Sequence, residues 1–171
     1  MASQLGAALV LATAGLLGAV VARTYQERPR VLRALQAALT MLATEISYAA
    51  TPLPEALRRV ARHTPAAVAA FFEEVSRELE QNPGAPAGEV WRRAVAARRG
   101  WCLTAEDEAV LLDLGGYLGR SSAADQERHL RLALAQLGRL QAEAEAQRDT
   151  QVRLWRYLGL CVGGCLVLLL Y

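Results

Sequence analysis

The sequence has no lysine and a single isoleucine, Ile46, whereas alanine, leucine and valine are abundant and arginine supplies the positive charge. We interpret this bias as the codon usage of a GC-rich genome and not as a functional signal. Charge is also absent from both ends of the chain, because all 19 basic and 17 acidic residues lie between Arg23 and Arg156. A soluble domain usually carries charge up to its ends, so this absence predicts a polar middle segment bracketed by apolar ones.

Cysteine is scarce as well, with three residues in the whole chain. Cys102 stands alone, whereas Cys161 and Cys165 lie one helical turn apart in an apolar tail without histidine or acidic residues. This usage argues against a disulfide scaffold and a metal site, and it fits small packing residues in a reducing compartment. The net charge of +2, with signs interspersed, lacks the clustered basic residues of nucleic-acid binding, so we expect no nucleic-acid partner.

The N-terminal segment 1–22 is predicted to be a transmembrane helix. Leu5 to Ala22 is free of charge, and at about 1.5 Å per residue it is roughly 27 Å long, close to the thickness of a hydrocarbon core. The alternative, a cleaved signal peptide, needs a basic segment in front, and no positive side chain precedes this run. A membrane anchor is therefore the better interpretation.

The C-terminal segment 154–171 is a shorter apolar stretch. It spans a bilayer if it starts near Leu154, with Trp155 and Tyr157 at the interface. The alternative is a hydrophobic helix that lies in a partner or enters the membrane partway. Both ends carry small residues at four-residue spacing, which allows close packing of membrane helices: Ala14 and Gly18 in one, Gly159 and Gly163 in the other.

Arginines flank both apolar segments on the side of the middle segment only. Arg23, Arg28 and Arg30 follow the first segment, Arg153 and Arg156 border the second, and neither outer end is charged. The positive-inside rule therefore places the middle of the chain in the cytoplasm and both short ends outside.

The middle segment shows helical periodicity throughout and no strand alternation. A stripe at 3-4-3-4 spacing comprises Leu32, Leu35, Leu39, Leu42 and Ile46. Helix caps are expected at Thr51-Pro52, Thr64-Pro65, Thr104, and Ser121 or Ser122. The last helix has no breaker, so we expect it to run for about 48 residues into the tail, roughly 70 Å. We predict an all-α fold: a cytoplasmic bundle of about six helices over residues 23–153, flanked by the two transmembrane helices.

No group of residues in the sequence forms a catalytic pattern. His63 and His129 lack Cys, Asp or Glu at metal-ligand spacing, and we interpret the acidic run Glu106-Asp107-Glu108 as solvated residues that complement a helix dipole. Gly115-Gly116 lacks the lysine and the spacing of a phosphate-binding loop. We therefore expect no enzyme activity, no metal or other cofactor, and no small-molecule substrate.

Two clusters in the sequence exceed what helix formation alone requires. Arg28-Pro29-Arg30 with Arg33 lies at the junction of span and bundle, and its simplest role is a topology signal with lipid headgroup contacts. Glu45 and Tyr48 lie three residues apart beside the leucine stripe, and Thr51-Pro52 follows them. This second cluster is either an internal hydrogen-bonded pair or part of a docking surface.

The chain resembles the stage III sporulation protein AB family over nearly its whole length, and both clusters lie in the first matching block. The first matching block reads Tyr25-x-x-Arg28-Pro29-Arg30-x-Leu32-Arg33-x-Leu35, followed by Thr44-Glu45-Ile46-x-Tyr48-x-x-Thr51-Pro52-Leu53. Later blocks are Leu118-Gly119-Arg120-Ser121 and Trp155-Arg156-x-Leu158-Gly159-x-x-x-Gly163. The chain departs from the family at Ser122, where members often have Asp, and around Pro83 to Gly88.

The resemblance implies a role in endospore formation. Family members belong to a channel complex between mother cell and forespore, and they look like F-type platform proteins of type II secretion systems. By that analogy the chain sits in the outer forespore membrane, and its bundle docks the cytoplasmic ATPase, stage III sporulation protein AA, beside other channel subunits. The alternative that the residues leave open is a two-span platform or adaptor protein of another secretion or pilus system.

Overall fold

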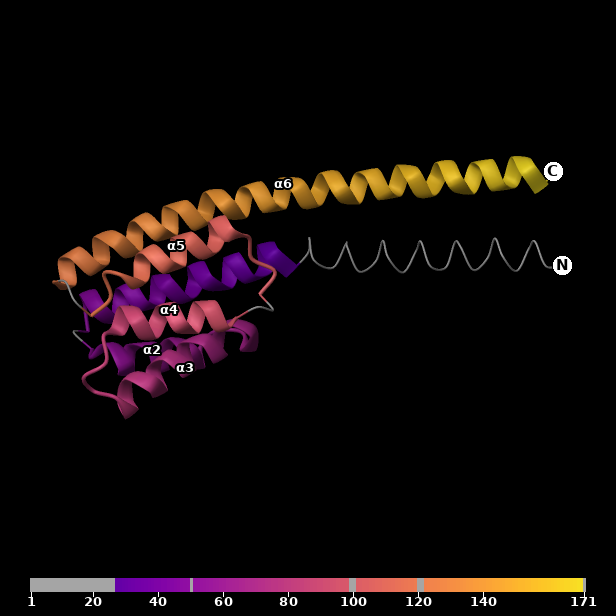
Figure 1. Cartoon of the computed structure of the whole chain (residues 1–171). Helices are drawn as coiled ribbons and strands as arrows, with labels where there is room; N and C mark the ends of the chain where they lie inside the picture. The colour runs from indigo at the N-terminus through magenta and orange to yellow at the C-terminus, as the bar shows by residue number, and fades with distance from the viewer. Residues whose placement is uncertain (1–26, 50, 99–100, 120–121, 171) are drawn as a thin grey trace. The chain divides into compact units, whose positions relative to one another are not determined.

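The computed structural model describes residues 27–49, 51–98, 101–119 and 122–170, with side chains described as far as residue 150. Within these ranges the chain forms six helices and no strand, which confirms the predicted all-α class (Figure 1). The helices are a first one over 27–47, then α2 (Leu53–Arg62), α3 (Ala66–Gln81), α4 (Ala87–Ala97), α5 (Ala105–Gly115) and α6 (Ala123–Leu170).

The chain divides into two compact units, of which Arg28–Ala142 is the helical bundle. Residues 1–27 and 143–171 make up the other unit. Within the bundle, α2 packs on α3, α3 on α4, and α4 on α5. In Figure 1 the bundle part of α6 and the pair α2 and α3 lie at opposite sides of this unit.

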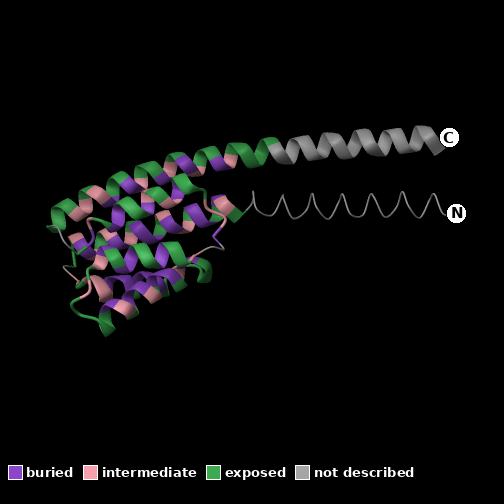
Figure 2. Cartoon of the chain, in the orientation of Figure 1, coloured by how far each residue is buried: buried purple, intermediate pink, exposed green. Residues whose placement is uncertain are grey.

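The leucine stripe of helix 27–47 is part of the core, as its spacing predicted. Its members Leu32, Leu35, Leu39, Leu42 and Ile46 are all buried, and Figure 2 shows buried residues along the inward faces of the other helices as well. Burying a leucine or isoleucine side chain stabilises the fold by about 1.5–3 kcal/mol, so this stripe holds the first helix against the rest of the bundle.

A cluster of aromatic side chains forms the core between α3 and α4. Phe71 packs edge-to-face on Phe72 and on Trp91, with ring centroids 5.1 Å and 4.7 Å apart. Trp91 is 1% exposed, and its indole N–H donates to the carbonyl oxygen of Leu111 on α5 at 2.7 Å. The same side chain therefore joins α3, α4 and α5.

Glycines allow α4 and α5 to approach at backbone distance. A Cβ atom at Gly88 would lie 2.6 Å from the carbonyl oxygen of Gly115, and a Cβ at Gly115 would overlap the Trp91 ring. Helix α5 ends at Gly115. Leu118, three residues beyond the end of α5, is buried.

Two of the predicted helix caps are confirmed. Thr104 is the N-cap of α5 in a reciprocal capping box with Asp107. Before α6, the hydroxyl of Ser122 accepts a hydrogen bond from the backbone N–H of Asp125 at 3.2 Å. Helix α6 has 48 residues, as the absence of a breaker predicted.

The predicted Thr-Pro caps are wrong. The N-cap positions of α2 and α3 belong to Pro52 and Pro65, which make no side-chain cap, so Pro52 lies one place before the first helical residue. The hydroxyl of Thr64 instead donates back to the carbonyl oxygen of Val60 at 2.6 Å, and that of Thr51 donates to Glu45 at 2.9 Å. Each threonine hydroxyl therefore binds the segment before it and does not cap the helix that follows.

The two predicted membrane spans lie outside the residues whose side chains the structure describes. Among the residues whose side chains are described, no helix is long and apolar enough to cross a bilayer. Residues 1–22 lie outside the described ranges altogether, and the side chains of 154–171 are not described.

Candidate docking surface

Arg28, the first member of the arginine cluster, is a structural residue of the bundle. Its guanidinium donates two hydrogen bonds to the carboxylate of Asp107, from Nε to Oδ2 at 2.8 Å and from Nη2 to Oδ1 at 2.9 Å. The Arg28 side chain is 13% exposed and that of Asp107 is 0% exposed. This two-pronged geometry is the strongest form of an arginine–carboxylate pair, and it fixes helix 27–47 to the start of α5.

Asp107 is held as a carboxylate by its neighbours. Burial opposes its charge, but hydrogen bonds from the Arg28 guanidinium and from the backbone and hydroxyl of Thr104 outweigh burial and lower the pKa of Asp107 below its usual value. The interpretation of Asp107 as a solvated residue is therefore wrong. Its side chain points inward because it caps the helix and meets the cation of Arg28 at the same time.

The other members of the arginine cluster divide between core and surface. Pro29 is buried, whereas Arg30 and Arg33 are exposed. The cluster thus combines an internal anchor, Arg28 with Pro29, and two arginines on the surface of the helix.

Glu45 is the centre of a polar network that joins the end of helix 27–47 to α2. Its carboxylate accepts from the hydroxyl of Thr51 at 2.9 Å and from the guanidinium of Arg59 at 3.1 Å, and Arg59 also donates to Glu55 at 2.8 Å. The backbone N–H of Thr51 donates to the carbonyl oxygen of Glu45 at 3.3 Å. Glu45 and Thr51 therefore shape the connection between the two helices.

Tyr48 does not take part in this network. Its side chain is 85% exposed, the highest value among the exposed large apolar residues of the described part. The partners of Glu45 are Thr51 and Arg59, so the alternative of an internal Glu45–Tyr48 pair is not what the structure shows. Pro52 is exposed as well, which leaves Tyr48 and Pro52 accessible to a partner.

The four small residues predicted to pack membrane helices cannot be placed. Ala14 and Gly18 lie outside the described residues, and nothing is described of the surroundings of Gly159 and Gly163.

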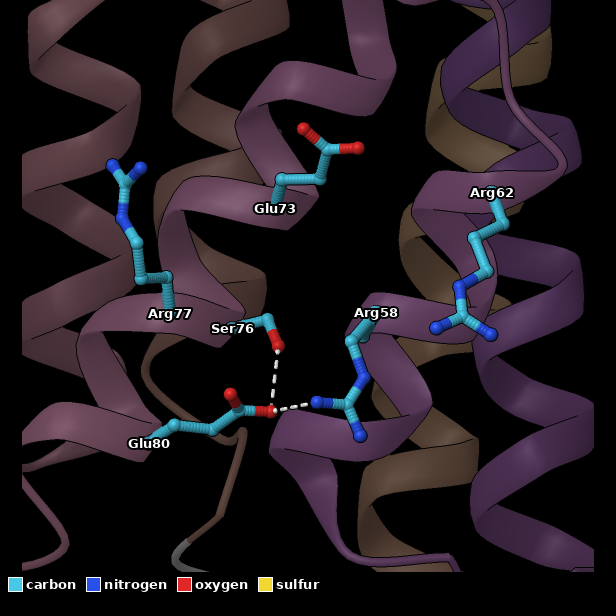
Figure 3. Close-up of a pocket in the computed structure, with 6 residues that line it drawn as sticks. All are labelled: Arg58, Arg62, Glu73, Ser76, Arg77 and Glu80. Atoms are coloured by element: carbon cyan, nitrogen blue, oxygen red, sulfur yellow. Dashed lines mark hydrogen bonds and ion pairs between the residues drawn. The ribbon is translucent and has the colours of Figure 1, made fainter.

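A charged groove lies between α2 and α3 (Figure 3). It has a volume of about 340 Å³ and is lined by Arg58 and Arg62 of α2 and by Glu73, Ser76, Arg77 and Glu80 of α3. Arg58 pairs with Glu80 across the groove at 2.8 Å, and the buried Ser76 donates from its hydroxyl to the carbonyl oxygen of Pro54 at 2.7 Å. The Ser76 hydrogen bond joins the two helices beneath the groove.

The sequence did not predict three features of the bundle. These were the burial of Asp107, the α2–α3 groove, and the stacking of His129 on Tyr117, whose rings lie 3.3 Å apart and 9° from parallel. Helical spacing did contain a signal for the groove, since Arg58 and Arg62 lie four residues apart, as do Glu73 and Arg77. In the part of the chain that is described, no three His, Cys, Asp or Glu side chains gather as a metal site would require.

Comparison with known proteins agrees with this arrangement. Residues 3–171 match the family described as Stage III sporulation protein AB (spore_III_AB). A relative, Stage III sporulation protein AB of Bacillus subtilis (strain 168), is 31% identical over 173 residues, which cover 99% of each chain. A solved structure, Stage III sporulation protein AB (SpoIIIAB), is similar with a TM-score of 0.67 and 30% identity, over 72% of this chain and 98% of that one. This chain, which is all-helical in the part that the structure describes, belongs to the stage III sporulation protein AB family.

Proposed function

We propose that this protein is a non-enzymatic membrane platform subunit of the channel complex between mother cell and forespore. Its bundle docks the cytoplasmic assembly ATPase, stage III sporulation protein AA, beside other channel subunits. The observation that carries the proposal is family membership, which extends over residues 3–171 and so includes both apolar ends. The same membership favours sporulation over another secretion or pilus system.

The platform is anchored at both ends in the outer forespore membrane. Residues 1–22 and 154–171 are the two spans, and the middle segment lies in the mother-cell cytoplasm. Charge-free ends and the arginines that border them on the inner side support this topology. Ala14 and Gly18, with Gly159 and Gly163, would allow close packing of the spans with each other or with a partner.

The bundle separates residues that build it from residues that face a partner. Arg28, Pro29, Glu45 and Thr51 are occupied in the fold, as their burial or hydrogen bonds show. Arg30, Arg33, Tyr48 and Pro52 are exposed. Tyrosine and arginine are enriched among the residues that dominate binding at protein interfaces, so Tyr48 is the first residue to test.

Replacing Tyr48 by alanine is expected to weaken capture of the ATPase by about tenfold, because an exposed aromatic anchor contributes on the order of 1–2 kcal/mol or more to binding. The measurement is capture of purified ATPase by the full chain in detergent, with immobilised protein titrated against increasing ATPase. The fold should be unaffected, since the side chain is 85% exposed.

Arg92→Ala is the matched control, because Arg92 is an exposed residue on α4 and belongs to neither of the two sequence clusters. Wild-type protein that captures no ATPase would refute the docking role as a whole. Equal capture by the wild type and Tyr48→Ala would remove Tyr48 from the interface.

A further inference from the structure

The α2–α3 groove is lined by three arginines and two glutamates, so its charged side chains carry a net charge of +1. Arg58 is paired with Glu80, but Arg62 and Arg77 form no ion pair with any residue that the structure describes. Figure 3 shows Arg58 and Arg62 on one helix, with Glu73, Ser76, Arg77 and Glu80 on the helix opposite, and the carboxylate of Glu73 lies between Arg62 and Arg77 in this view. Two guanidinium groups on separate helices therefore flank an open groove.

The groove is rigid beneath its charged rim. Buried Leu57 and Val60 of α2 and Phe72 and Val75 of α3 join the two helices. Ser76 is 2% exposed, and its hydroxyl ties α3 to the first turn of α2 through Pro54. A preformed site loses little conformational entropy on binding, which favours recognition of a partner.

The lining excludes some classes of ligand. Small-molecule pockets are mostly apolar with a few polar groups, whereas this groove is lined by five charged residues and one serine. A membrane surface or a nucleic acid presents negative charge alone, and Glu73 and Glu80 in the lining would repel it. A protein segment of mixed composition can place its carboxylates on the arginines and keep them clear of the glutamates.

We infer that the α2–α3 groove binds an acidic segment of the docked ATPase, with Arg62 and Arg77 as the principal contacts. The inference rests on the proposed function and assigns the docking chemistry to this groove. Guanidinium groups bind carboxylates with two parallel hydrogen bonds, which makes arginine the preferred residue for such interfaces. The exposed Arg58–Glu80 pair is worth only about 0–1 kcal/mol, so a carboxylate of the partner can take Arg58 as well at little cost.

The test compares two double variants of the full chain in detergent. Arg62→Glu with Arg77→Glu reverses the charge of the groove, and Arg92→Glu with Arg128→Glu makes the same change at exposed positions on α4 and α6. The groove variant is expected to lose capture of the ATPase by about tenfold or more, whereas the control variant keeps it. Helical content by circular dichroism shows that both variants are folded.

A second measurement separates failure of the inference from failure of the proposed function. A fluorescein-labelled peptide in which glutamates alternate with serines is titrated against the wild type and the two double variants. If the wild type captures no ATPase but binds the peptide through Arg62 and Arg77, the groove stands as an acidic-segment site and the proposed partner is wrong. The inference would be overturned if the groove variant bound the ATPase as tightly as the wild type does, or if it bound the peptide as tightly as the wild type does. Release of the ATPase by phosphatidylglycerol micelles but not by the peptide would identify a headgroup site and would also overturn it.

Discussion

The Arg28→Ala variant is expected to lose about 3–5 kcal/mol of its free energy of unfolding, because it leaves the carboxylate of Asp107 buried without its cation. The side chain of Asp107 is 0% exposed, so water cannot replace the two hydrogen bonds that Arg28 donates. The measurement is urea unfolding of the bundle fragment 23–153, followed by circular dichroism. An unchanged urea midpoint would show that the pair contributes nothing to stability.

Arg92→Ala provides the matched control for this prediction. Arg92 is exposed on α4, and a surface substitution of this kind changes stability by about 0.5 kcal/mol at most. The double variant Arg28→Ala with Asp107→Asn tests the mechanism, because it removes the orphaned negative charge. The double variant should recover part of the loss in free energy of unfolding. A loss equal to the sum of the losses in the two single variants would argue against a direct interaction.

The pH dependence of stability follows from the same pair. The pKa of Asp107 is lower in the folded protein than in the unfolded chain, so the folded state holds the proton less tightly. The stability from this pair is fully present above the unfolded pKa of about 3.9, and it is lost as the pH falls through the lower folded pKa. The difference in stability between the wild type and Asp107→Asn should therefore stay constant from neutral pH down to about 5 and shrink below about 4.

Replacing Trp91 by alanine is expected to cost about 3–5 kcal/mol, since a large buried aromatic side chain leaves a cavity that helices cannot easily close. Trp91 packs edge-to-face on Phe71 and Phe72, with ring centroids 4.7 Å and 5.9 Å away. Its indole N–H also donates to Leu111, so the variant loses a hydrogen bond between α4 and α5 as well. Urea unfolding of the same fragment measures the loss.

Two further variants make the Trp91 prediction specific. Trp91→Phe keeps an aromatic ring but removes the N–H, and its loss should be clearly smaller than that of Trp91→Ala. Leu132→Ala truncates an apolar side chain that is 52% exposed, so its stability should change by about 0.5 kcal/mol at most. A similar loss in Leu132→Ala and Trp91→Ala would mean that the aromatic cluster is not the centre of the core.

The features that the sequence predicted correctly depend on local periodicity. The stripe from Leu32 to Ile46 is buried because residues three and four apart share a helix face, whatever the fold around them. The length of α6 follows from the absence of proline between Ser122 and the tail. Thr104 caps α5 because an acidic residue stands at the position that completes a capping box.

The features that the sequence did not predict depend on contacts between distant segments. Arg28 and Asp107 are 79 residues apart, and nothing in the local pattern of either shows that they meet. The acidic run after Thr104 has the same composition whether its side chains face water or the core. Helix α5 stops at Gly115 where α4 crosses it closely at Gly88, and a single sequence does not show which helices cross.

The candidate docking residues include some that hold the fold and others that are exposed, and this division also depends on contacts between distant segments. The family resemblance brought out Arg28, Glu45 and Thr51 together with Tyr48, but it did not distinguish residues that hold the fold from residues that bind a partner. The structure makes that distinction through burial and hydrogen bonds, since Glu45 is bonded to Thr51 and Arg59 whereas Tyr48 is exposed. Motif similarity alone would direct mutagenesis of an interface toward residues that are part of the bundle.

The most direct test of the platform account is the location of the bundle relative to the membrane. Single-cysteine variants without the three native cysteines are expressed in non-sporulating cells, where the chain enters the plasma membrane with the same side facing the cytoplasm, and the cysteine is placed at Ser3 or at the exposed Ala96 of α4. In intact protoplasts, an impermeant maleimide should label Ser3→Cys at once and Ala96→Cys only after lysis, with all of the chain in the membrane fraction. Labelling of Ala96→Cys in intact protoplasts, or recovery of the chain in the aqueous fraction without detergent, would contradict the account.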